Sequence, residues 1–205
     1  MKSVDAFLRE LERPKCVARL PRMESNIPTP AVELPPDVLL GLDLGWLMAP
    51  IPAESIWASS WAAMCRPTSQ RSDLEYLFSR SSQPNWLLKT GPASDVIAVA
   101  FAIDCAREAL QLLGEQSDAW RQTLRFRTGH SLFYLFRHPG ARLPARKAFG
   151  GGAVRIFSGQ LINVPPSRIL GKLLSYRDPQ ARPLEMPDLS ELSQRGRVDG
   201  FDCDF

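Results

Sequence analysis

The sequence predicts a single domain of the α+β (mixed α/β) class, with a central mixed sheet flanked by helices. Apolar runs of strand length alternate irregularly with segments of helical periodicity, and glycine- or proline-rich turns separate them. The composition, 44% hydrophobic and 23% charged over 205 residues, is that of an ordinary soluble globular protein. We expect a proline-rich arm over residues 1–36, the domain over 37–177, and a polar tail with an acidic tip over 178–205.

Local patterns predict the individual elements of this domain. Helical periodicity predicts helices over residues 37–44, 69–78, 104–113 and 167–176, with Asp104 at the N-cap position of the third. Apolar runs predict strands over residues 47–51, 85–90, 95–103, 132–137, 153–157 and 160–164. The strand over 95–103 is apolar on both faces, which predicts a central position in the sheet. The turn Ser158-Gly159 predicts that the last two strands form a hairpin.

Basic residues are concentrated in one part of the chain. The segment Ala119–Arg177 contains eleven Lys or Arg residues and no Asp or Glu, which leaves 14 basic against 22 acidic residues in the remainder. Such segregation is typical of a surface that meets a polyanion, either a phosphate backbone or a nucleotide. A solvated basic face explains the same pattern equally well, so charge alone does not decide between the two.

Other patterns in the sequence indicate where the protein is located and which roles its cysteines do not have. The chain has no run of about 18 apolar residues, and acidic residues occupy the start, where a secretion signal needs an apolar stretch. We therefore expect a cytoplasmic protein with no membrane partner. The four cysteines stand far apart without a CxxC pair, which argues against a zinc site and against a disulfide scaffold.

Three stretches carry distinctive motifs: PNWLLKTGPASDVIAVAFAID over 84–104, RTGHSLFYLFRHPG over 127–140, and GGAVRIFSGQLINVPPS over 151–167. With LLGLDLGWLMAPI over 39–51, their order resembles the bifunctional primase/polymerase (prim-pol) family of the archaeo-eukaryotic primase superfamily. The first stretch is similar to the family's Pro-x-Asn strand, Thr-Gly turn and Asp-x-Asp strand. The others are similar to its histidine-bearing hairpin and to its acid-bearing strand that runs to Pro-Pro-Ser. The resemblance implies the prim-pol fold.

The resemblance also places the family's catalytic residues, most of which are replaced here. Joining nucleotides by this chemistry requires carboxylates that converge on two divalent cations. Ala102 and Asp104 fall on the family's Asp-x-Asp, Phe133 on its phosphate-binding histidine, and Val154 or one of its neighbours on its third carboxylate. Asp104 is then the only catalytic carboxylate that remains. We expect no metal site and no cofactor, with Mg²⁺ or Mn²⁺ needed only if the chain is active.

Candidate phosphate-binding residues lie mostly in the basic segment. In the family, a basic groove holds the phosphates of template and nucleotide. The candidates here are Lys89, Arg125, Arg127, His130, Arg137, Arg142, Arg146, Lys147 and Arg155. We expect Arg137 and Arg155 to lie beside the missing carboxylates, because both fall on predicted strands of the site.

These observations lead to three hypotheses about function. The first is a catalytically degenerate primase/polymerase-like protein, a nucleic-acid-binding or scaffolding accessory in plasmid, phage or chromosomal replication. Its expected partners are a nucleic acid or nucleotide and a replication protein such as a helicase or an intact primase. The second is a divergent but active, metal-dependent DNA primase/polymerase. The third is a protein-interaction domain that binds a partner through its arm and tail, whose last residues VDGFDCDF resemble the acidic tips of single-stranded-DNA-binding proteins.

Overall fold

The computed structural model describes residues 33–53, 66–80, 83–105, 117–140, 148–149 and 154–187. The chain forms two compact units, Met1–Ala31 and Val32–Phe205, and every described residue belongs to the second. The predicted arm up to residue 32, the helix predicted beyond residue 105, and the acidic tip lie outside these ranges. No helix in the described part is long and apolar enough to cross a membrane.

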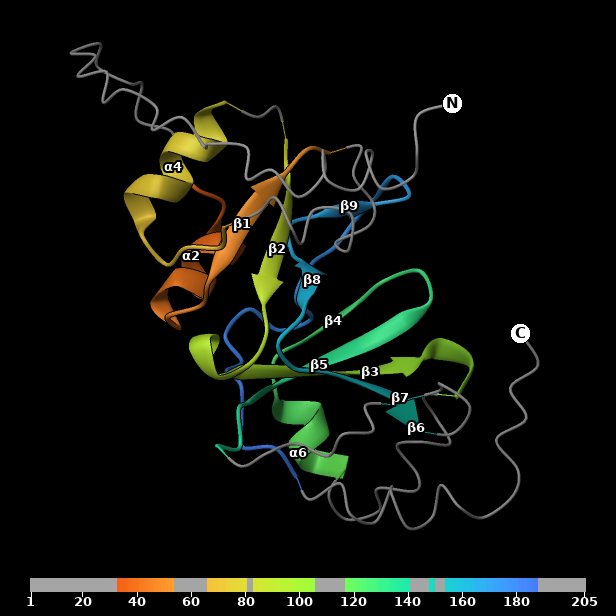
Figure 1. The fold of residues 1–205 in the computed structure, drawn as a ribbon. Coiled ribbons are helices and arrows are strands. Elements are labelled where there is room, and N and C mark those ends of the chain that lie inside the picture. Colours follow the sequence, from red (N-terminus) through yellow and green to blue (C-terminus); the bar gives the residue numbers. More distant parts are fainter. Residues whose placement is uncertain are drawn as a thin grey trace, which may run out of the picture. The chain divides into compact units, whose positions relative to one another are not determined.

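Two antiparallel sheets form the framework of the described domain (Figure 1). The smaller sheet has the order β1 (Met48–Ile51), β2 (Asn85–Lys89), β8 (Leu161–Val164). The larger has the order β4 (Arg125–Arg127), β5 (Ser131–Arg137), β3 (Val96–Ala102), β7 (Val154–Phe157), β6 (Ala148–Phe149). The α+β class and the central position of β3 are confirmed. The single mixed sheet is wrong in detail, because the strands of both sheets pair antiparallel.

Helices are short and pack beside these sheets. They are α2 (Pro36–Asp43), α4 (Arg71–Ser79) and α6 (Ser117–Gln122), with 3₁₀ turns at Pro92–Ser94 and Ile103–Cys105. Pro36 begins α2 where a proline costs no intrahelical hydrogen bond. Gly41 lets the same helix approach β1, because a Cβ there would overlap the Met48 side chain. The first two predicted helices are therefore confirmed within two residues at each end.

The chain passes between the two sheets at two adjacent crossings, β2 to β3 and β7 to β8. The backbone of Thr90, in the first crossing, accepts a hydrogen bond from Gly159 at 3.0 Å, and its hydroxyl accepts one from Gln160 at 3.1 Å. The predicted hairpin of β7 and β8 is wrong for this reason. Ser158-Gly159 does turn the chain, but it sends β8 to the smaller sheet, where β8 pairs with β2.

The segment after β8 forms a hairpin and not the helix predicted over 167–176. Strands β9 (Arg168–Ile169) and β10 (Lys172–Leu173) pair antiparallel around Leu170 and Gly171. Both turn residues have positive φ, +50° and +76°, which a helix cannot accommodate. Downstream, residues that we assigned to the tail pack on the domain: Leu184 and Met186 contact the core of the larger sheet, and the Leu184 carbonyl accepts a hydrogen bond from the Arg137 amide.

Each face of the larger sheet packs against a different core. One face joins the smaller sheet and α2, with Val96, Ala98 and Leu135 packed among Val38, Leu88 and others. The opposite face carries alternate residues of the same strands and surrounds Trp120 of α6. Trp120 meets Phe101, Tyr134 and Phe136 edge to face at centroid distances of 4.7–5.3 Å. For brevity we call the first face the inner face and the second the α6 face.

Candidate functional site

The Asp-x-Asp position lies at the end of the central strand β3. Side chains alternate along a strand, so Ala98, Ala100 and Ala102 share the inner face, whereas Val99 and Phe101 lie on the α6 face. Asp104 follows in the 3₁₀ turn Ile103–Cys105 and is exposed. One methyl group and one carboxylate therefore occupy the two positions on which the resemblance places a pair of carboxylates.

The turn that carries His130 lies beside Asp104. The Ile103 amide donates to the His130 carbonyl oxygen at 3.0 Å, and Ala102 pairs with Ser131 across β3 and β5. The hydroxyl of Thr128 closes this tight turn by accepting from the Ser131 amide at 3.0 Å. His130 and Asp104 are thus neighbours at one end of the sheet, both exposed. Ser131 is a polar residue of this end that sequence reasoning missed, since a serine in a strand gives no distinctive signal.

Strand β7 places Arg155, and not Val154, on the inner face. Arg155 pairs with Ala100, and Val154 pairs with Phe101. Cross-strand partners share a face, so Val154 faces α6, where it is 4% exposed in the core around Trp120. A carboxylate at Val154 could not converge with one at Ala102. Val154 therefore does not share a face with Ala102, whereas Arg155, the one-residue slip that we allowed, does, and its side chain is exposed.

Phe133, at the position of the family's histidine, belongs to an aromatic row on the inner face. Its ring stacks on Phe126 of β4 at 4.9 Å and 3°, and meets Phe157 of β7 at 5.7 Å. Phe133 and Phe157 come from strands on either side of β3, and the alanines of β3 leave room between them. Phe133 thus has an apolar packing role at the position on which the resemblance places a phosphate-binding histidine.

The predicted basic groove is not assembled as one surface by the described residues. Arg137 pairs with Val96, six residues before Ala102 and about 20 Å away along an extended strand. Arg125 and Arg127 pair with Tyr134 and Leu132, so they lie on the α6 face. These placements correct the expectation that Arg137 lies beside the missing carboxylates. Only Arg155 of the strand candidates lies there.

Two further groups of candidates complete the set. Lys89 ends β2 in the smaller sheet, where its ammonium donates to the Gly159 carbonyl at 2.7 Å and so satisfies the crossing turn. Arg142, Arg146 and Lys147 lie outside the described residues. Lys89 thus makes a structural contact, and phosphate binding by all four residues stays a prediction.

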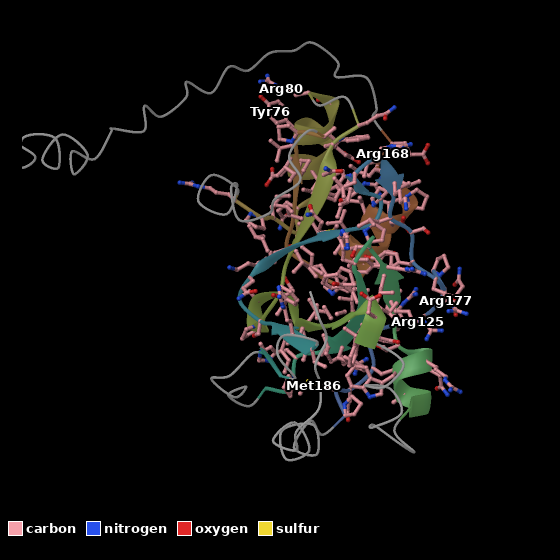
Figure 2. The ribbon with its side chains drawn as sticks, turned by 90° about the vertical axis from the view of Figure 1, so that its right-hand side faces the viewer. Tyr76, Arg80, Arg125, Arg168, Arg177 and Met186 are labelled. Carbon is pink, nitrogen blue, oxygen red and sulfur yellow. The ribbon has the colours of Figure 1, made fainter. Side chains whose placement is uncertain are left out.

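A second basic group surrounds Tyr134 on the α6 face, and sequence reasoning named only its member Arg125. Arg125 hydrogen-bonds the Tyr134 side chain, and Arg121 and Arg177 lie close enough to act on its charge. The backbone amide of Arg177 donates to the Arg125 carbonyl at 2.9 Å, which holds the two arginines side by side (Figure 2). Burial raises the pKa of Tyr134 and the three arginines oppose that rise only in part. Arg177 was missed as a neighbour because we expected a helix just before it.

The residues present do not fit a site for two divalent cations. Such sites need several carboxylates on one face, whereas the inner face carries Ala102 and the cationic Arg155, and Asp104 follows only in the 3₁₀ turn. Within the described ranges no group of three His, Cys, Asp or Glu residues converges anywhere. We therefore derive no step through a metal.

A comparison with family models gives the class of this domain. The chain matches the model described as "Bifunctional DNA primase/polymerase, N-terminal" over residues 40–189, which is more than half of its length. Since the α+β fold and the order of motifs agree with that match, the chain belongs to the Prim-Pol family. The match extends past residue 177, as does the packing of Leu184 and Met186. A comparison with curated protein sequences gave no match.

Proposed function

We propose that this primase/polymerase-like protein is catalytically degenerate and binds nucleic acid as an accessory in the replication of a plasmid, phage or chromosome. The proposal depends chiefly on one observation, the place of Arg155 on the inner face. A cation takes a position where the family's chemistry needs an acid, so the face repels divalent metal and attracts phosphate.

The surroundings of Arg155 support binding over a structural role. Its side chain is exposed and makes no ion pair with any other described residue. It is part of a segment of 59 residues, Ala119–Arg177, without a single acid. The aromatic row beside it supplies flat apolar surface, and partly exposed Phe133 and Phe157 are of the kind on which bases of a single strand stack.

Two assays on the full chain test the proposal. Anisotropy of labelled single-stranded DNA should rise on titration with the protein, and the affinity should fall steeply with salt because phosphate contacts release counterions. Primer synthesis on a single-stranded template in Mn²⁺ should be undetectable. Synthesis that Asp104→Ala abolishes would contradict the degenerate site, and absence of DNA binding at low salt would contradict the binding role and favour a protein-interaction domain.

A further inference from the structure

The hairpin of β9 and β10 exposes two leucines that the fold does not use. Leu170 is 69% exposed and Leu173 is 55% exposed. Leu173 pairs with Arg168, so these two side chains share the outward side of the hairpin, while Ile169 packs against the core. Figure 2 shows Arg168 on this element. The hairpin therefore presents apolar and basic side chains together at its tip.

The turn of this hairpin violates a local rule of sequence and structure. Leu170 has φ +50°, a conformation that suits Asn or Gly at a two-residue hairpin turn and is unfavourable for a bulky side chain. Replacing Leu170 by Asn, before Gly171, would relieve that strain. The core would stay equally covered, because Leu170 does not pack against it. Packing and turn geometry thus give no reason for a leucine at this position. An exposed apolar side chain held under strain is a feature of contact sites.

The base of the hairpin is held firmly, so the tip is presented in a defined position. The hydroxyl of buried Ser167 accepts from the Trp86 amide at 2.7 Å and donates to the Trp86 carbonyl at 3.1 Å. The Arg168 amide donates to the Asn85 side chain at 2.6 Å, and Leu174 donates to the Ser167 carbonyl at 2.8 Å. Binding at the tip then requires little ordering of the backbone, which favours affinity.

Charge decides what kind of partner suits this tip. Arg168 lies beside Leu173 on the outward side, whereas Lys172, the partner of Ile169, is exposed next to the Leu170-Gly171 turn. Neither basic residue makes an ion pair within the described part of the chain. A complementary partner carries acids together with bulky apolar side chains. A nucleic acid offers the negative charge, but its bases prefer the flat faces of aromatic side chains to leucine. A peptide with both features fits better.

We propose that the tip, defined by Arg168, Leu170, Lys172 and Leu173, docks an acidic, aromatic peptide, and that the segment Val198–Phe205 of this chain is its occupant. This segment, VDGFDCDF, carries three Asp and two Phe residues and no basic residue. The described domain ends at residue 187, and the ten residues 188–197 reach up to about 35 Å when extended. That span is the tether available to the segment, and its charge and its aromatic side chains complement the tip.

The test uses the full chain with Phe201→Ser and Phe205→Ser, which removes competition from its own tail. A labelled synthetic peptide VDGFDSDF, with Ser in place of Cys203, is titrated against it by anisotropy. We expect saturable binding that weakens with salt. Leu170→Asn should weaken peptide binding at least about tenfold, because a leucine that docking would bury is replaced by a polar group. Arg168→Gln should weaken it less and flatten the salt dependence.

Matched variants separate docking from folding. Leu170→Asn should keep or raise the thermal unfolding midpoint, since Asn suits the turn. Leu77→Asn, which changes the 39% exposed leucine of α4, should leave peptide binding unchanged. Arg155→Ala should also leave it unchanged, so the test of peptide docking does not depend on the proposed binding of DNA. The proposal is overturned if the peptide does not bind, if Leu170→Asn binds it as well as the parent does, or if Leu170→Asn weakens only the binding of DNA.

Discussion

Arg155 pairs with Ala100 across the central strand, on the sheet face that also carries Ala102. The face that should collect negative charge for metal binding thus carries a fixed positive charge two residues from the Asp-x-Asp position. A guanidinium has only N–H donors and no acceptor atom, so it cannot serve as a metal ligand. Because this pairing fixes which side chains share a face, it allows more specific predictions than the sequence alone.

Arg155→Ala should weaken the binding of single-stranded DNA and reduce its salt dependence, because a phosphate contact is lost. A loss of about threefold to tenfold is the expected size for one charge-assisted contact. Arg137→Ala is the matched control, since Arg137 is equally exposed but lies at the far end of β5. Anisotropy at several salt concentrations measures both. Equal effects of the two variants would mean that binding is spread over the sheet and not centred on the inner face.

Restoring carboxylates should restore metal binding only in the register that the structure gives. Ala102→Asp with Arg155→Glu places two new acids on the face near Asp104, and we expect Mn²⁺ binding that titration calorimetry detects. Ala102→Asp with Val154→Glu should not bind Mn²⁺. The second variant should also lose about 3 kcal/mol of stability, because its Glu enters the core around Trp120 without a partner. Tighter Mn²⁺ binding by the Val154 variant would contradict the placement of Arg155, and not Val154, on the inner face.

Gly91→Ala should destabilise the crossing between the two sheets. Gly91 has φ +114°, and a Cβ there would lie 2.9 Å from the Gly159 amide nitrogen, which already bonds to Thr90. Backbone strain and the clash together predict a loss of about 3 kcal/mol or more. Gly45→Ala, at a φ of +73° near the left-handed region and with open space around it, should cost only about 1 kcal/mol. Urea unfolding monitored by tryptophan fluorescence compares the two, and equal losses would exclude the clash.

Tyr176→Phe should reduce the loss of stability at alkaline pH. Burial raises the pKa of Tyr176 above its ordinary value of 10.0, and nearby Asp37 raises it further. The folded state therefore keeps a proton that the unfolded state releases, so the stabilising contribution is present below about pH 10 and is lost as pH rises above it. The Tyr176 hydroxyl has no hydrogen-bond partner among the described residues, so its removal should cost little at pH 7. Thermal unfolding from pH 7 to pH 11 tests this, and identical pH profiles would contradict it.

Local sequence patterns predicted the elements well and their pairing less well. The positions of β1, β2, β3 and β5 follow from apolar runs that only a buried strand explains, so periodicity was sufficient. The partner of β8 could not be predicted, because a Ser-Gly turn reverses the chain equally well within one sheet or between two. The hairpin around Leu170 was predicted as a helix for a different reason. A leucine in the sequence does not indicate a left-handed turn.

For the candidate site, too, local motifs could be predicted from the sequence better than strand register could. The absence of an acid at Ala102 could be read directly from the sequence, and the degenerate site that it implies stays a prediction. The third position could not be fixed without the register, since a slip of one residue moves a side chain to the opposite face. Arg155 and Val154 differ by that single step, and one is exposed to solvent while the other is buried.

The two crossings held together at Thr90 and Gly159 bear on how this domain folds. Hydrogen bonds between them join residues about 70 positions apart in the chain. The smaller sheet takes strands from both sides of that span, whereas the strands of the larger sheet all lie within it. Neither half of the sequence contains a complete sheet. Closing so long a loop has an entropic cost before the contacts reward it, so folding is expected to be slow and cooperative. Chains cut between β5 and β7 should therefore yield fragments that acquire order only when mixed.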